Sequence, residues 1–180
     1  MAASAANALA ASRVRNPIPE RLLDAVDFRR ALGRFATGVT IVTTRGPAGR
    51  TEGVTVNSFS SVSLDPPLVL WCLQSAAPSA PSFLAAEWFA INVLGADQHH
   101  LSRHFATPHP DKFAAIATTS GLGDCPLLPS ALARFECRAE RSIEAGDHTI
   151  FLGRVVRLEH REGEPLVFSA GRFCVPSPLT

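Results

Sequence analysis

Two strand-like runs follow each other in residues 51–73, and they differ in how polar and apolar positions are arranged. In residues 53–64 the two kinds of position alternate, whereas residues 68–73 are continuously apolar. A strand points alternate residues to opposite faces of its sheet, so the first run predicts one apolar face and one face of hydroxyl and amide groups. Residues 65–67, Asp-Pro-Pro, predict a turn between the runs, because proline fixes φ and has no N–H to donate. The apolar positions are Val54, Val56, Val62 and Leu64, and the polar positions are Thr55, Asn57, Ser61 and Ser63.

The polar face of the first run carries no charged side chain. A strand face that water covers commonly holds Thr and Ser, and that interpretation accounts for the composition by itself. Such a face would typically also carry a Lys or a Glu. Short neutral donors and acceptors suit an uncharged, flat ligand with polar edges that is held partly away from water. Both interpretations stay open on the pattern alone.

The preceding segment predicts a helix, a strand and a turn. Residues 27–35 show apolar residues at helical spacing, with Asp27 as the cap and one buried stripe. Gly38 ends this segment, the β-branched residues 39–44 predict a strand, and residues 45–50 (RGPAGR) predict a hairpin turn. Together with the later strands, this order predicts an antiparallel β-barrel with helices at its rim. The stripe consists of Phe28, Ala31, Leu32 and Phe35.

The rest of the chain continues with strands and short helices. Gly153 inside one of these strands predicts a bulge or a close backbone approach. We expect strands at residues 89–94, 131–142, 148–159 and 165–168, helical turns at 83–87, a helix at 96–105 with a continuation at 111–116, and a loop at 118–129.

Length and composition narrow the class of protein. A chain of 180 residues supports about one domain, and we expect a flexible leader at residues 1–22 followed by one domain at residues 23–180. Seventeen basic and sixteen acidic side chains give a net charge of +1, which argues against a nucleic-acid partner. No apolar run approaches the ~20 residues that span a bilayer, so we expect no membrane partner. Four widely spaced cysteines and six histidines without metal-binding spacing predict free thiols in a reducing cytoplasm and no metal site.

Four stretches, in this order along the chain, resemble the flavin reductase family: RALGRFATGVTIVTT, GVTVNSFSSVSLDPPLVLWCL, FAINVLGADQHHLSRHFA and GDHTIFLGRV. The resemblance covers residues 27–173 and implies a mainly β fold with flanking helices, the FMN-binding split barrel of antiparallel Greek-key type. It also implies NAD(P)H-dependent reduction of FMN or FAD, by hydride transfer from nicotinamide C4 to flavin N5. The reduced flavin would pass to a separate flavin-dependent monooxygenase. We expect a cytoplasmic homodimer, because active sites in barrels of this type commonly form where two subunits meet.

Positions that match the family become candidates for flavin binding. Donors near the pyrimidine end of a flavin stabilise the negative charge that reduction places on N1, and residues 54–58 supply neutral donors of this kind. Many relatives have a basic residue and a Ser-Ser pair after the strand 68–73, where this chain has Ser75, Ala76 and Ala77. We therefore expect Ser79 and backbone N–H groups to meet the phosphate. The complete flavin-binding set is Thr37, Gly38, Val54, Thr55, Val56, Asn57, Ser58, Gln74, Ser75, Ser79, Phe105 and Lys112.

His148, within the sequence GDH, is the candidate catalytic residue. A neutral imidazole can hydrogen-bond the nicotinamide carboxamide or ribose, and it need not supply a proton, because the hydride passes directly from nicotinamide to flavin. The residues expected on the nicotinamide side are His148, Phe168, Gly171 and Phe173. Structural roles stay open for four candidates: a local strand bond for Asn57, a core position for Phe105, a solvated charge for Lys112, and a strand start capped by Asp147 for His148.

Two other functions also stay open. The chain could be a flavoprotein that keeps its FMN and reduces another substrate, or a non-catalytic barrel that carries flavin or another apolar ligand. The GDH sequence favours an enzyme, because a carrier has no use for a nicotinamide contact. The sequence does not choose between FMN and FAD or between NADH and NADPH, and it does not identify the monooxygenase.

Overall fold

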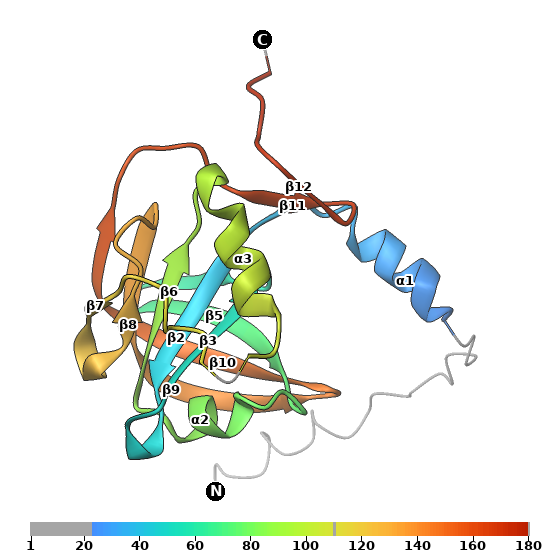
Figure 1. Cartoon of the computed structure of the whole chain (residues 1–180). Coiled ribbons are helices and arrows are strands. Elements are labelled where there is room, and N and C mark those ends of the chain that lie inside the picture. Colours follow the sequence, from blue (N-terminus) through green and yellow to red (C-terminus); the bar gives the residue numbers. More distant parts are fainter. Residues whose placement is uncertain (1–22, 110, 180) are drawn as a thin grey trace, which may run out of the picture. The chain divides into compact units, whose positions relative to one another are not determined.

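The computed structural model of the chain describes residues 23–109 and 111–179 (Figure 1). The chain divides into two units, residues 1–32 and residues 33–180. Helix α1 (Ala25–Leu32) is the described element of the first unit, and all strands belong to the second. The predicted leader, residues 1–22, lies outside the described residues. Within the described part of the chain, no helix has the length and apolar composition that a membrane span requires.

Helix α1 begins and ends earlier than predicted and buries no side chain. Asp24, rather than Asp27, caps it, because its carboxylate accepts a hydrogen bond from the backbone N–H two residues further on (3.0 Å). Phe28 and Leu32 are 51% and 57% exposed, and Phe35 lies beyond the helix. The prediction of a buried stripe is therefore wrong: in the single chain these side chains are exposed. A helix of about two turns can bury an apolar face only against a neighbouring surface.

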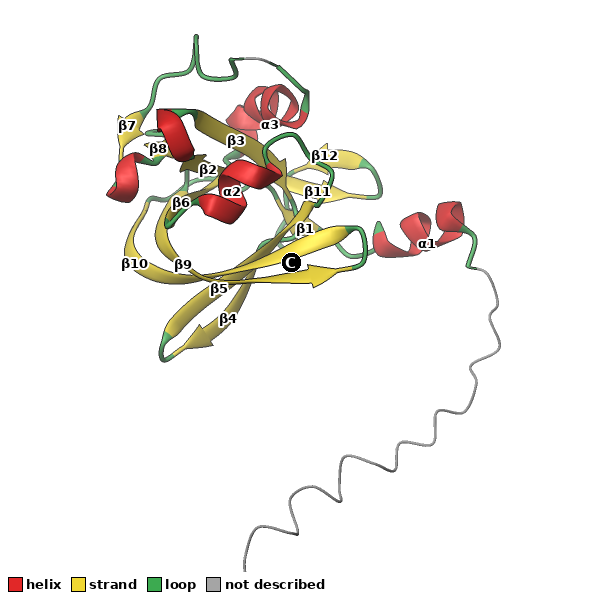
Figure 2. Ribbon diagram, turned by 90° about the horizontal axis from the view of Figure 1, so that it is seen from below, coloured by secondary structure: helices red, strands yellow, loops and turns green. Residues whose placement is uncertain are grey.

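Seven antiparallel strands of the second unit form one curled sheet, in the order β3-β2-β6-β9-β10-β5-β4 (Figures 1 and 2). This arrangement confirms the predicted antiparallel barrel. The strands are β2 (Thr40–Arg45), β3 (Thr51–Val56), β4 (Ser60–Leu64), β5 (Pro67–Gln74), β6 (Trp88–Val93), β9 (Ala133–Ala145) and β10 (His148–His160). Two small sheets accompany it: one joins β1 (Thr37–Gly38), β11 (Val167–Ser169) and β12 (Arg172–Cys174), the other β7 (Thr119–Ser120) and β8 (Pro126–Leu127).

Short helices connect the strands. They are α2 (Ala80–Ala85), α3 (His99–Ala106) and the 3-10 turns η1 (Pro47–Gly49), η2 (Ala96–Gln98) and η3 (Leu122–Asp124). Figure 2 shows α2 across one end of the curled sheet. The expected helical continuation at residues 111–116 is wrong: these residues form turns and bends, and the Asp111 carboxylate accepts the backbone N–H of Phe113 (3.0 Å) in a local turn.

The inner face of the sheet packs around Trp71. Its indole stacks on Phe151, with ring centroids 4.5 Å apart, and meets Phe83 of α2 and Phe89 of β6 edge-on at 4.9 and 5.8 Å. Trp71 is 0% exposed, and the three phenylalanines are at most 4% exposed. The aromatic cluster joins β5, β6, β10 and α2, and so fixes the curvature of the sheet on which the site is built.

The predicted strand at residues 53–64 is wrong as one element. The chain leaves β3 after Val56 and enters β4 at Ser60, and these strands lie at opposite edges of the sheet. Ser58 explains the break, because its hydroxyl accepts the backbone N–H of Cys72 (2.9 Å) and donates to the carbonyl of the same residue (3.2 Å). A side chain thus takes the place of a ladder hydrogen bond while the chain crosses from one edge to the other. The expected continuous apolar face is lost as well, since Leu64 is 94% exposed.

The long strands β9 and β10 confirm the prediction for residues 131–142 and 148–159, except that β9 begins at Ala133 and ends at Ala145, and β10 ends one residue later. Their register shifts between Leu152 and Gly153, which confirms the predicted irregularity at the glycine. A Cβ at Gly153 would lie 2.2 Å from the ring of Phe89, so only a glycine lets the β10 backbone approach this part of the core.

Candidate functional site

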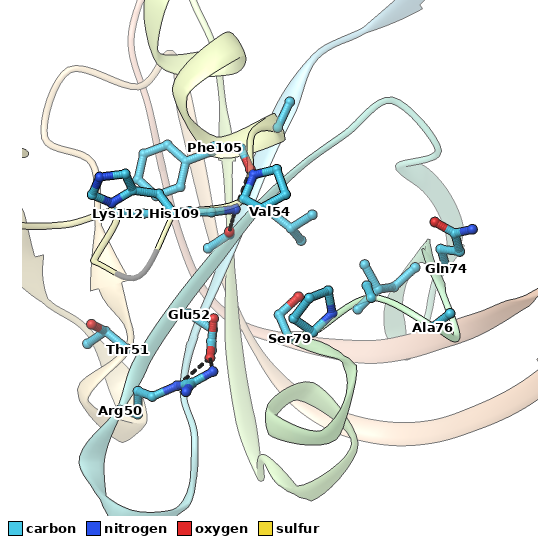
Figure 3. A pocket seen from close by; sticks show the side chains of 16 residues that line it. Arg50, Thr51, Glu52, Val54, Gln74, Ala76, Ser79, Phe105, His109 and Lys112 are labelled. Atoms are coloured by element: carbon cyan, nitrogen blue, oxygen red, sulfur yellow. Dashed lines mark hydrogen bonds and ion pairs between the residues drawn. The ribbon is translucent and has the colours of Figure 1, made fainter.

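A pocket of about 620 Å³ opens beside the edge strand β3. Three segments line it: residues 50–54 of β3 and the turn before it, the end of β5 with the loop to residue 79, and the end of α3 with the loop that follows (Figure 3). Five of the twelve residues predicted to bind flavin line this pocket, namely Val54, Gln74, Ser79, Phe105 and Lys112.

Lys112 ties the loop after α3 to β3. Its ammonium donates to the carbonyl oxygens of Phe105 (2.7 Å) and Gly53 (3.1 Å), and its third N–H has no further acceptor among the described residues. Burial lowers the pKa of Lys112 below its ordinary value of 10.5, and the negative charge of Glu52 opposes that effect. Lys112 therefore has both a structural role and a charge that belongs to the pocket.

Phe105 belongs to the core and also forms a wall of the pocket. Its side chain is 0% exposed and packs edge-on against Phe113, with ring centroids 5.1 Å apart. The ring lies so close to β3 that a Cβ on Gly53 would come within 2.6 Å of it. The absence of a side chain at position 53 thus lets α3 approach the strand that carries the pocket.

An ion pair that the sequence analysis did not single out forms one side of the pocket. The Arg50 Nε donates to Glu52 Oε1 (2.7 Å), and its Nη2 contacts the same oxygen (Figure 3). The Glu52 side chain is 13% exposed and the Arg50 side chain 67%. The sequence pattern predicts a turn at residues 45–50 and alternation from Gly53 onward, and so does not single out either residue. The period-2 pattern did contain the signal, because Glu52 has the same parity as Val54 and therefore shares its face.

Residues 55–58 comprise the end of β3 and the two residues after it, and most of their side chains already have partners. The Thr55 hydroxyl donates to the carbonyl of Ser102 in α3 (2.7 Å), and Val56 is 8% exposed in the core. Ser58 is bonded to Cys72, as described above, whereas Asn57 is exposed. A ligand on this segment would therefore meet backbone groups and the Asn57 amide.

Ser75 and His148 lie next to the pocket rather than in its lining. The Ser75 hydroxyl lies 3.2 Å from that of Thr149, and its N–H donates to the Asp147 carbonyl (2.9 Å). His148 pairs with the pocket residue Gln74 across β5 and β10. Its Nδ1 lies 2.7 Å from an Asp147 carboxylate oxygen, which fixes the ring and leaves Nε2 for another partner.

The remaining candidates come together in the small β1-β11-β12 sheet, and none of them lines the pocket. Thr37 pairs with Phe168, Gly38 follows Thr37 in β1, and the Phe168 and Phe173 rings lie 5.4 Å apart. Gly171, with φ +78°, forms the turn between β11 and β12. The buried hydroxyl of Thr37 has no hydrogen-bond partner among the described residues.

Metal-binding side chains do not gather elsewhere in the described ranges: no group of three or more His, Cys, Asp or Glu residues there could hold a metal ion. Two of the four free cysteines are deeply buried, and burial raises the pKa of Cys125 to about 11 and that of Cys137 to about 12. These two thiols are therefore protonated near neutral pH and are poor nucleophiles.

Comparisons with known proteins identify the family. The family model described as "Flavin reductase like domain" matches residues 32–177. FMN reductase (NADH) SmoA of Agrobacterium fabrum is 51% identical over 146 residues, which cover 81% of this chain and 83% of that protein. HsaB of Rhodococcus jostii, the reductase subunit of a flavin-dependent monooxygenase, is 39% identical over 84% of this chain and 77% of its own. The solved structure of the NADH:FAD oxidoreductase of Streptomyces globisporus, in complex with NAD and FAD fragments, matches with a TM-score of 0.82 at 43% identity, over 86% of this chain and 94% of that one.

An antiparallel barrel with a large pocket against one edge strand is an architecture suited to binding a sizeable ligand. The matches to the family model and to its relatives show which family this is: the chain belongs to the flavin reductase-like family. The resemblance noted in the sequence and the split-barrel fold class are thereby confirmed.

Proposed function

We propose that this chain catalyses the reduction of FMN or FAD by NADH or NADPH and supplies the reduced flavin to a separate monooxygenase. The observation that carries the proposal is the pocket beside β3, where predicted flavin-binding residues from three segments meet. The printed names of the relatives support it, since they include an NADH-dependent FMN reductase and the reductase subunit of a flavin-dependent monooxygenase.

The residues present fit a flavin. Beyond Val54, the backbone of residues 55–58 and the exposed Asn57 amide offer neutral donors and acceptors for the ring edge. The loop at residues 74–79, which also lines the pocket, has no cation, and Ser79 and backbone N–H groups are its donors for a phosphate. The Lys112 ammonium, which also lines the pocket, adds a positive charge. The flavin supplies the hydride acceptor, N5, when it is bound.

His148 and the small sheet would hold the nicotinamide. Because His148 pairs with Gln74, its imidazole lies at the rim of the flavin pocket, with Nε2 free to hydrogen-bond a carboxamide or ribose. The protein would contribute orientation: these residues would hold the nicotinamide against the flavin, and none of them would move a proton to the reacting atoms. Thr37, Gly38, Phe168, Gly171 and Phe173 are assigned to the same active site through the family resemblance.

A second copy of the chain is proposed to cover the outer face of β5 and β10. Leu70 pairs with Leu152 and Cys72 with Ile150, so these side chains share one face, opposite the buried Trp71. They are only partly buried in the single chain, on a sheet whose other side is the core. Burying this face against the same face of a second copy would give a two-fold dimer. The cytoplasm is the proposed compartment, since four free thiols suit a reducing environment.

Steady-state kinetics test the proposal. Purified protein is mixed with each combination of FMN or FAD and NADH or NADPH, and the loss of nicotinamide absorbance is followed. Saturable oxidation that needs added flavin is the expected result. No oxidation with any pair, together with a purified protein that binds flavin, would instead identify a carrier.

A further inference from the structure

The two sides of the pocket differ in the chemistry they offer. Figure 3 shows Gln74 and Ala76 on one side, Arg50 and Glu52 on the other, and Ser79 between them. The proposed ring and phosphate contacts occupy the first side and the middle. The Arg50–Glu52 pair lines the same pocket and has no part in those contacts.

Glu52 presents an acceptor that the chain leaves open. Its Oε1 receives the Arg50 hydrogen bonds and lies 3.5 Å from the Ser82 hydroxyl. Among the described residues, no group donates to Oε2. Oε2 is accessible at the pocket, so it can accept a hydrogen bond from a ligand that brings a donor, such as a hydroxyl or an amine.

Arg50 presents the complementary donors. A guanidinium has five N–H groups in a fixed fork, and the pair with Glu52 uses only its Nε and Nη2 side. The remaining N–H groups lie on a side chain that is 67% exposed at the pocket. Because Glu52 holds the guanidinium in place, these donors are preorganised for phosphate oxygens.

The distance of Arg50 and Glu52 from the residues proposed to bind the flavin ring suits FAD and not FMN. From residue 56 to residue 50 the chain takes six steps of extended backbone, about 20 Å at the rise of a strand. FMN ends at a single phosphate, for which Ser79 and its loop are available. FAD continues into a second phosphate, a ribose with two hydroxyls and an adenine with an amine. The second phosphate offers acceptors for the Arg50 donors, and the ribose hydroxyls and the adenine amine offer donors for the Glu52 carboxylate.

We propose that Arg50 and Glu52 form a subsite for the adenosine diphosphate half of FAD, in which Arg50 binds the diphosphate and Glu52 accepts a hydrogen bond from a ribose hydroxyl. The pair makes the enzyme select FAD over FMN. This assignment rests on the proposed function, because it takes the flavin ring to lie toward Gln74 and residues 54–58.

Equilibrium binding tests the assignment without using turnover. Dissociation constants are measured for riboflavin, FMN and FAD, and ADP is titrated as a competitor of FAD. The variants are Arg50→Gln, Glu52→Gln and the exchanged pair Arg50→Glu/Glu52→Arg, with Arg103→Gln as a matched control, because Arg103 is an exposed arginine outside the pocket. Arg50→Gln is expected to weaken FAD about tenfold and to change FMN and riboflavin by less than about twofold, as loss of one charge-assisted contact implies.

The exchanged pair separates recognition from support of the fold. It keeps an ion pair at the strand end but reverses which position offers donors, so FAD binding is expected to stay weak while thermal stability returns to the parent value. Equal weakening of FMN and FAD, unchanged FAD binding in both single variants, or full recovery of FAD binding in the exchanged pair would each overturn the assignment. Failure of the parent protein to bind either flavin would overturn the proposed function itself, and the subsite with it.

Discussion

Replacing Gly53 by alanine tests how closely α3 must approach β3 to form the pocket. The new Cβ would lie 2.6 Å from two ring carbons of Phe105 and 3.0 Å from the Phe113 ring. Carbon atoms in contact ordinarily sit about 3.5–4 Å apart, so the Phe105 ring must retreat by roughly 1 Å. Phe105 is 0% exposed and already packed against Phe113, so no empty space receives it.

Overpacking a core in this way typically costs about 1–3 kcal/mol, and with two rings affected we expect a loss of about 2 kcal/mol in the free energy of unfolding. For a chain of this length that corresponds to a fall in Tm of roughly 4–8 °C. Flavin affinity is expected to fall as well, because Phe105 lines the pocket and the Gly53 carbonyl holds Lys112.

Urea unfolding gives the stability change, and titration of flavin fluorescence gives the affinity change. Gly38→Ala is the control for stability, because a Cβ at Gly38 meets nothing within 4 Å and neither glycine has a positive φ. The control is expected to stay within about 0.5 kcal/mol of the parent. If Gly53→Ala were as stable as the control and bound flavin as tightly as the parent, the close contact between α3 and β3 would not shape the pocket.

Three further changes examine separate parts of the structure. Leu152→Lys places a charge on the outer face of β10 and is expected to convert a dimer into a monomer in light scattering; a parent protein that is already monomeric would contradict the proposed interface. His148→Gln is expected to raise the KM for the nicotinamide about tenfold with the flavin dissociation constant unchanged, and a change in flavin binding alone would place His148 elsewhere in the site. Glu136 is 4% exposed, and although burial opposes it, hydrogen bonds from Arg157 and a backbone N–H lower its pKa. A carboxylate whose pKa is lower in the folded state than its unfolded value near 4.3 stabilises the fold above that value, and this stabilisation is lost as the pH falls through the folded pKa. Glu136→Gln should therefore lower the free energy of unfolding by about 1–2 kcal/mol at pH 7 and by little in acid. A difference between variant and parent that does not depend on pH would contradict this.

The sequence predicts most strands because alternation is a local property. The long strands β9 and β10 and the apolar β5 follow directly from the spacing of their own residues. The break between β3 and β4 could not be predicted in this way, since it depends on Ser58 bonding the backbone of Cys72 fourteen residues later. The stripe of α1 failed for a related reason: helical spacing indicates which residues could be buried, but it does not supply the surface that buries them.

The candidate site was predicted in part. Family resemblance singled out Lys112 and Ser79, and the structure brings both to one pocket. It did not single out Arg50 and Glu52, which lie in a turn and at a strand start where a charged residue is ordinarily solvated. Their proximity to Ser79 depends on β3 lying opposite the loop after β5, and no local pattern encodes that arrangement.

The most direct test of the account is a single-turnover experiment without oxygen. The purified protein is mixed with oxidised flavin and a stoichiometric amount of NADH, and the absorbance of both is followed. The account predicts that the flavin loses its yellow colour at the rate at which NADH is consumed, one for one, and much faster than without protein. Unchanged flavin absorbance over many half-times of the expected reaction, or NADH loss without flavin reduction, would contradict it.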